Sequence, residues 1–211
     1  HVLTNNKNML IVAVSIILTM ALTALLNSVD YRISPALIGV MMVALLVEER
    51  TAMAVNIVLS FCIGLFSKDS SGSILGFDSM VMTATMLLGG QVVIYLLHRH
   101  HRRGTIVAAG LFSGIAAACM HIAIYLIIHT KLSELLIAAA WILGSNAVCA
   151  VLVVGSLSLW ENLFDIATSA RLNELSNANH PLLRQLMTEA PGTYRHSMWT
   201  AALAESAAEA I

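Results

Sequence analysis

Charged residues are scarce in this sequence, and their scarcity argues against an ordinary soluble domain. Only 11% of its 211 residues are charged and 58% are hydrophobic, whereas soluble domains carry about 25% charged residues. The formal net charge is −1, so the chain has no basic excess with which to bind a nucleic-acid polymer. We therefore expect a membrane protein whose main partner is the lipid bilayer, and no nucleic-acid partner.

Cysteine and proline are also rare. The three cysteines, Cys62, Cys119 and Cys149, lie inside apolar stretches and show no paired, metal-like spacing. We interpret them as buried packing residues. Two of the three prolines, Pro181 and Pro191, lie close together in the last fifth of the chain, at points where a helix can begin but not continue.

Six apolar runs follow one another along the first 160 residues. Asp, Glu, Lys and Arg are absent from their interiors, and Glu134 stands at the start of the sixth. A charge at the bilayer centre costs at least ~2.5 kcal/mol on insertion scales, and a crossing helix needs about 20 apolar residues. The fold class that we predict is all-α, a polytopic membrane bundle of about six transmembrane helices followed by a cytoplasmic helical segment. The runs are Met9–Leu26, Ile33–Val47, Thr51–Phe66, Met80–Leu97, Thr105–Ile128 and Leu132–Trp160.

The second and third runs are short for a crossing. Residues 33–66 form either a tight hairpin that crosses twice and turns at Glu48, Glu49 and Arg50, or a re-entrant pair that neighbouring helices bury. Both arrangements leave an even number of crossings, so both ends share one side of the membrane. That side carries the excess of Lys and Arg, which is typical of the cytoplasm. It would hold Lys7, Arg50, Arg99, Arg102, Arg103 and Arg171, against Arg32, Lys68 and Lys131 opposite.

Polar residues inside the runs permit two interpretations. Asn56, Gln91, His121 and Asn146 could line an intramembrane pocket for a small ligand or ion. We favour hydrogen bonds between helices, each worth about 0.6 to 2 kcal/mol. A GxxxG step at Gly110 and Gly114 should let another helix approach closely, and it leaves a homodimer open as a further partner.

The loop His98–Arg103 (HRHHRR) is the densest group of histidine and arginine. His98, His100 and His101 could bind a metal, but the nearby sequence offers no Cys, Asp or Glu to complete a site. We favour a basic turn that contacts anionic lipid headgroups or an adjoining soluble domain.

The stretch from Gly155 to Ser176 contains no proline and no second glycine. An imperfect apolar stripe at helical spacing continues through it, with Glu161 and Asp165 on other faces. We therefore predict a continuous helix that ends roughly 20 to 25 Å below the membrane. Our hypothesis is that it transmits piston or rotational movement, and the alternative is a passive tether. The stripe comprises Trp160, Leu163, Phe164, Ala167, Leu172 and Leu175.

Residues 172–197 (LNELSNANHPLLRQLMTEAPGTYRHS) mark the change from membrane to water. The residues before Pro181 predict a helix end, a turn and a new helix, because the residue before a proline avoids the α region. Pro191 predicts a second helix end followed by a second helix start in the same way. Thr193 is then a candidate N-cap for a helix from Tyr194 to Ile211, which would place His196 in its first turn.

The run ELSNANHPLLRQLMTEAPGTYRHS, followed by LAESAAEAI, closely resembles a junction in bacterial seven-transmembrane HD-domain phosphodiesterases, which hydrolyse cyclic di-AMP. The resemblance implies an extracellular domain, a further helix ahead of Met9, a multi-pass domain in the inner membrane and a cytoplasmic HD hydrolase domain. It also implies that His196 is the first ligand of a divalent metal pair, Mn or Fe, whose other ligands lie beyond Ile211.

This resemblance divides the chain into a membrane domain (1–160), a coupling helix and linker (161–180) and the start of an HD domain (181–211). The expected coupling residues are Trp160, Phe164, Leu172, Pro181 and Pro191. We expect a fragment of this length to be catalytically inactive and to bind no metal. The alternatives are a small carrier or channel whose path is lined by the intramembrane polar residues, and an anchor that only holds a hydrolase at the membrane.

Overall fold

The computed structural model describes residues 6–26, 35–66, 76–99, 103–127, 131–166, 168, 171–172 and 175–210. These residues form helices and connecting turns, and no strand occurs among them. The chain is divided into two compact units, His1–Thr168 and Ser169–Ile211, which are described separately below. The predicted all-α class is confirmed.

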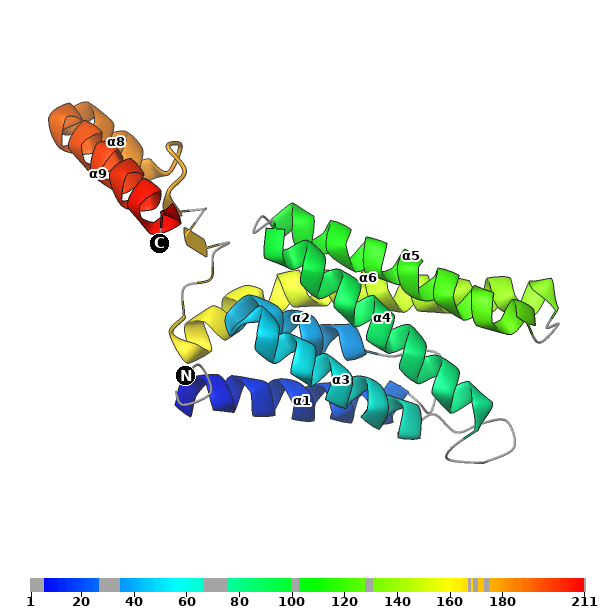
Figure 1. Ribbon diagram of the computed structural model, residues 1–211. Coiled ribbons are helices and arrows are strands. Elements are labelled where there is room, and N and C mark those ends of the chain that lie inside the picture. Colours follow the sequence, from blue (N-terminus) through cyan, green and yellow to red (C-terminus); the bar gives the residue numbers. More distant parts are fainter. Residues whose placement is uncertain are drawn as a thin grey trace. The chain divides into compact units, whose positions relative to one another are not determined.

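Six helices lie in the described part of the first unit (Figure 1). Each contains most of one predicted apolar run. Four of them, α1, α4, α5 and α6, are long and apolar enough to cross a bilayer, so the chain is a multi-pass membrane protein. The bounds are α1 (Asn6–Leu26), α2 (Ala36–Leu46), α3 (Glu49–Phe66), α4 (Phe77–Arg99), α5 (Arg103–Ile127) and α6 (Leu132–Phe164).

Helix α2 is the core of this unit. Its 11 residues are buried on every side except near its end, and it packs against α1, α3, α4 and α6. At ~1.5 Å per residue it is only ~16 Å long, about half of the ~30 Å hydrocarbon layer. Helices α2 and α3 lie side by side and turn at Val47 and Glu48. Helix α2 is therefore short and buried by its neighbours, whereas α3 has 18 residues and an exposed side. The choice between the two arrangements for residues 33–66 stays a prediction.

Glycines bring the long helices into close contact. A Cβ atom on Gly110 of α5 would overlap the side chain of Ala150 on α6, and one on Gly114 would lie 3.1 Å from the Cβ of Asn146. The predicted close approach at the GxxxG step is therefore confirmed, and it occurs between α5 and α6 of the same chain. The step consequently gives no support to a homodimer.

Helix α6 ends at Phe164, and the predicted continuous helix from Gly155 to Ser176 is wrong. Asp165 adopts the left-handed conformation, with φ 52° and ψ 55°. The backbone N–H groups of Asp165 and Ile166 both donate to the carbonyl oxygen of Glu161, which closes the helix end. Neither proline nor glycine is needed, because Asp tolerates this conformation better than most residues.

Asp165 permits a test of this helix end. Its side chain is exposed, so Asp165→Val in the full-length protein changes mainly the backbone preference, at a cost of about 1 to 2 kcal/mol. Asp165→Gly should be neutral or stabilising. Thermal unfolding in detergent, with hydrogen exchange at the amides of Asp165 and Ile166, measures the difference. Equal stability and exchange in the two variants would mean that the chain does not turn here.

The second unit contains α8 (Pro181–Glu189) and α9 (Pro191–Glu209), which pack on each other. Each begins with its proline, where the missing N–H group would have had no partner. The turn before Pro181 is also as predicted, and the Asn179 N–H group donates to Asn177 Oδ1 at 3.0 Å. The predicted start at Tyr194 is wrong, because α9 begins three residues earlier and its N-cap is Ala190 rather than Thr193. His196 therefore lies in the second turn.

Candidate functional site

The centre of the membrane unit contains a buried asparagine between α3 and α4. Asn56 is 1% exposed, and its Nδ2 donates to the carbonyl oxygen of Leu87 at 3.0 Å. Its Oδ1 accepts a hydrogen bond from Ser60 at 3.4 Å. A Cβ atom on Gly90 would overlap the amide group of Asn56. The glycine thus makes room for a hydrogen bond between two helices at a place where no lipid could satisfy it.

A small cavity lies beside this asparagine. Asn56 and Asn146 both line it, together with Thr85, and its volume of about 10 Å³ is close to the space that one water molecule needs. Ligand pockets are usually about 300 Å³ or larger. Asn146 donates from Nδ2 to the Ile142 carbonyl of its own helix at 3.0 Å, and Ser113 donates to the Gly89 carbonyl at 2.7 Å. The bonds of Asn56 and Ser113 therefore join neighbouring helices, whereas that of Asn146 stays within α6.

The other two predicted pocket residues do not line this cavity. Gln91 is half-buried on α4. His121 is buried on α5, with its ring 4.7 Å from that of Tyr125. The Tyr125 hydroxyl donates to the Asp78 carboxylate, so this group joins the first turn of α4 to the last turns of α5. Sequence analysis missed the pair because 47 residues separate its members.

The last turns of α6 hold two of the predicted coupling residues. The rings of Trp160 and Phe164 stack 5.8 Å apart. Glu161, only 6% exposed, accepts a hydrogen bond from the Thr168 hydroxyl. We call this contact the Glu161–Thr168 clasp, because it holds the chain beyond α6 against the end of that helix.

The predicted faces of α6 need correction at this point. Glu161 continues the buried stripe that runs through Val153 and Leu157 at a spacing of four residues, whereas Leu163 is 73% exposed. The spacing could have revealed the position of Glu161, but its charge argued against burial. Among the remaining coupling residues, Leu172 is exposed, and Pro181 and Pro191 begin α8 and α9.

At the start of the basic turn, His98 contacts an acidic side chain that the sequence did not indicate. His98 Nδ1 at the end of α4 lies 2.7 Å from Glu49 Oε2 at the start of α3. Glu49 is distant in the sequence, and the α3–α4 contact brings it beside this turn. His100 and His101 lie outside the described residues.

His196 has the chemistry of a single metal ligand. Its side chain is exposed on α9, while its carbonyl oxygen accepts a hydrogen bond from Thr200 at 2.9 Å. Within the described part of the chain, no group of three His, Cys, Asp or Glu side chains is placed to hold a metal ion. An exposed imidazole fits one coordination position, and metal sites generally need three or more protein ligands.

Comparison with known proteins connects these features. Residues 1–168 match the family described as "7TM receptor with intracellular HD hydrolase". The chain belongs to this family. The matched range ends at the same residue as the first compact unit.

Two relatives are proteins named cyclic-di-AMP phosphodiesterase PgpH. The one from Bacillus subtilis (strain 168) is 33% identical over 217 aligned residues, which cover 97% of this chain. The one from Listeria monocytogenes is 31% identical over 84% of the chain. An uncharacterised protein of Synechocystis is 34% identical over 61% of the chain. The chain spans 30% of the length of the Bacillus protein and 24% of the Listeria protein. No solved structure matches.

Proposed function

We propose that this chain is the membrane domain, together with the coupling segment, of a bacterial phosphodiesterase that hydrolyses cyclic di-AMP. The observation that carries the proposal is the similarity to PgpH over nearly the whole chain, including the second unit. In this proposal residues 181–211 begin a cytoplasmic HD domain. Both ends of the chain then lie on the cytoplasmic side of the inner membrane, which agrees with the excess of Lys and Arg there.

His196 would supply one ligand of a divalent metal pair, Mn or Fe, and the other ligands would come from chain beyond Ile211. Such a pair lowers the pKa of a bound water and stabilises the attacking and leaving oxygens. The exposed imidazole of His196 is available for this role, and α9 holds it at a defined position.

The membrane unit would regulate the hydrolase through the Glu161–Thr168 clasp. A helix that ends at Phe164 cannot transmit a push as one continuous rod. Movement of α6 would instead change the direction in which the chain leaves the clasp. The stacked rings of Trp160 and Phe164 lie in the last turns of α6 and would transmit that movement to the chain that follows. The carrier alternative gains no support, since the cavity between Asn56 and Asn146 has room for about one water.

The direct test is hydrolysis by the purified full-length protein in Mn²⁺. We expect cyclic di-AMP to be opened at its phosphodiester bond, with product formation followed by chromatography, and we expect chelation of the metal to stop the reaction. Cyclic di-GMP serves as the comparison substrate. An absence of cyclic di-AMP turnover in a folded protein supplied with metal would refute the proposed activity.

A further inference from the structure

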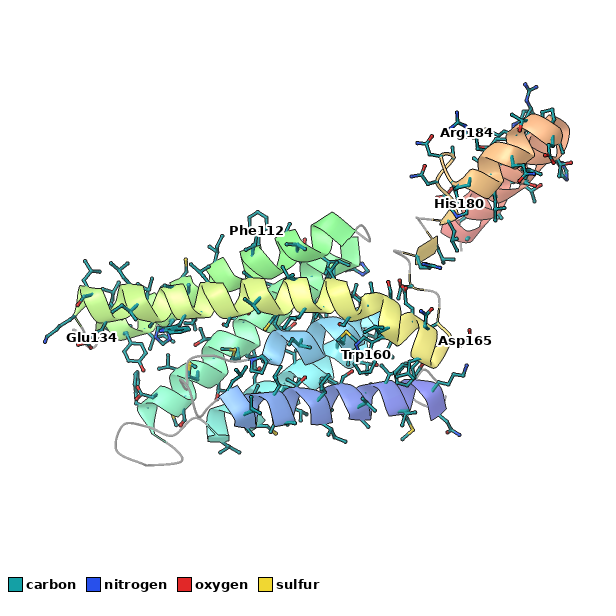
Figure 2. All side chains as sticks on the ribbon, turned by 180° about the vertical axis from the view of Figure 1, so that it is seen from behind. Phe112, Glu134, Trp160, Asp165, His180 and Arg184 are labelled. Carbon is teal, nitrogen blue, oxygen red and sulfur yellow. The ribbon has the colours of Figure 1, made fainter. Side chains whose placement is uncertain are left out.

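A long apolar groove lies between α1 and α6. It consists of two adjoining cavities of about 320 and 410 Å³, and both are lined by Leu22, Ile38 and Leu152. On α6 the lining runs from Trp141 to Leu163, which is ~33 Å at ~1.5 Å per residue. This length matches the ~30 Å hydrocarbon layer of a bilayer. Figure 2 shows α2 between α6 and α1, with Trp160 on the side of α6 that faces α1.

The groove is a gap in an otherwise closed ring of helices. Around the central α2, contacts lead from α1 to α3, α4, α5 and α6 in turn, but α1 and α6 are not packed on each other in the same way. Four of the described helices, α1, α3, α4 and α6, pack directly on α2, and α5 packs on α4 and α6. A helix can have about six neighbours of its own diameter when helices pack at their usual spacing of 8–10 Å. The gap has the place and the length of one more membrane helix.

The side of α6 that lines the groove is suited to another helix. It combines small residues with large apolar ones, and small residues let two helix backbones approach closely in a membrane. Lipid chains need no such small residues. Helix α1 is the least buried of the four long helices, because only 22% of its most apolar stretch is buried. It therefore also exposes apolar surface that another helix can contact. The small residues of α6 along the groove are Gly144, Ser145, Cys149 and Ser156.

We propose that the groove is the docking site of a further transmembrane helix of the same protein, from the part that precedes residue 1. The family to which the chain belongs is described as having seven transmembrane helices, and the described residues of the matched range contain six helices. A helix that directly precedes α1 would pack antiparallel beside it, as consecutive membrane helices with short connections do. It would close the ring by contacting both α1 and α6. This inference concerns the membrane domain alone and does not depend on the hydrolytic activity.

Neighbouring residues of α6 provide a matched test. Leu152 lines both cavities, whereas Val151 is at the same depth but about 100° around the helix. The exposed fractions of the two side chains are 52% and 59%. Each is replaced by a spin-labelled cysteine in full-length protein without native cysteines, reconstituted in liposomes. Paramagnetic resonance then measures the accessibility of each label to oxygen dissolved in the bilayer.

We expect the label at position 152 to be several-fold less accessible than the label at 151, at every ratio of protein to lipid. Equal accessibility would mean that lipid fills the groove, and it would overturn the proposal. Protection at 152 that disappears when the protein is diluted in lipid would assign the groove to a second copy, which also overturns it. Cyclic di-AMP hydrolysis is measured on the same samples, so a failure of this inference is distinguishable from a failure of the proposed function.

A second pair of variants does not depend on the label. Ser156 lines the groove, and Ser158, two residues later, does not. We expect Ser156→Trp to lower the Tm of the full-length protein by several degrees, since a docked helix leaves no room for the indole. Ser158→Trp should leave the Tm unchanged. An unchanged Tm in Ser156→Trp would contradict a docked helix.

Discussion

Replacing His196 by alanine in the full-length protein should reduce the turnover of cyclic di-AMP by at least ~100-fold. Loss of residues that merely support metal ligands commonly costs 10- to 100-fold in metal affinity or activity, and loss of a ligand itself should cost more. We expect both kcat and the amount of bound Mn to decrease. Steady-state kinetics and metal analysis of the purified protein measure these two quantities.

His180 provides the matched control. It lies immediately before α8, and its side chain makes no capping hydrogen bond. His180→Ala should keep turnover and bound metal within about twofold of the unmodified protein, because surface substitutions away from special features have small effects. If His196→Ala has the same turnover and metal content as the control, His196 is not a metal ligand.

Replacing Gly90 by alanine should have the largest effect on the stability of the membrane unit. The new methyl group would overlap the amide of Asn56, which is buried and donates to the Leu87 carbonyl. Either the helices separate or that hydrogen bond breaks. Overpacking and a lost buried hydrogen bond each cost about 1 to 3 kcal/mol, so we expect a total on the order of 3 kcal/mol. The yield of folded protein and the Tm in detergent measure it.

Two further variants isolate the cause. A Cβ atom on Gly104, near the start of α5, would meet nothing within 4 Å, so Gly104→Ala should leave the Tm unchanged or raise it slightly. The double variant Gly90→Ala with Asn56→Ala should lose less stability than the sum of the two single changes, because both act on one contact. Additive losses would show that Gly90 and Asn56 do not interact.

Prediction from the sequence succeeded where local chemistry decides the structure. The exclusion of charge from the interiors of the apolar runs located each of the six helices described in the membrane unit. Pro181 and Pro191 marked the starts of α8 and α9, because a proline loses nothing at the first position of a helix. The contiguous motif around His196 indicated the family, to which the chain does belong.

Prediction failed where a backbone turn or a contact outside a single helix decides the structure. The left-handed conformation of Asp165 ends α6 although the sequence shows no proline or glycine there. Glu161 is buried although it is charged, since the Thr168 hydroxyl lies within reach once the chain turns back. The pairing of Glu49 with His98 likewise depends on α3 and α4 lying side by side.

The sequence by itself determined that the chain is a bundle of membrane helices joined to a polar helical segment. Hydropathy, charge and proline act on each stretch separately, so they can be interpreted without knowing its neighbours. Only the tertiary structure decided that the short α2 is the centre of the bundle, that Asn56 and Asn146 share a cavity of one water's size, and that a groove separates α1 from α6. These features depend on which helices meet and at which residues, and the packing of side chains across the whole unit sets those meetings.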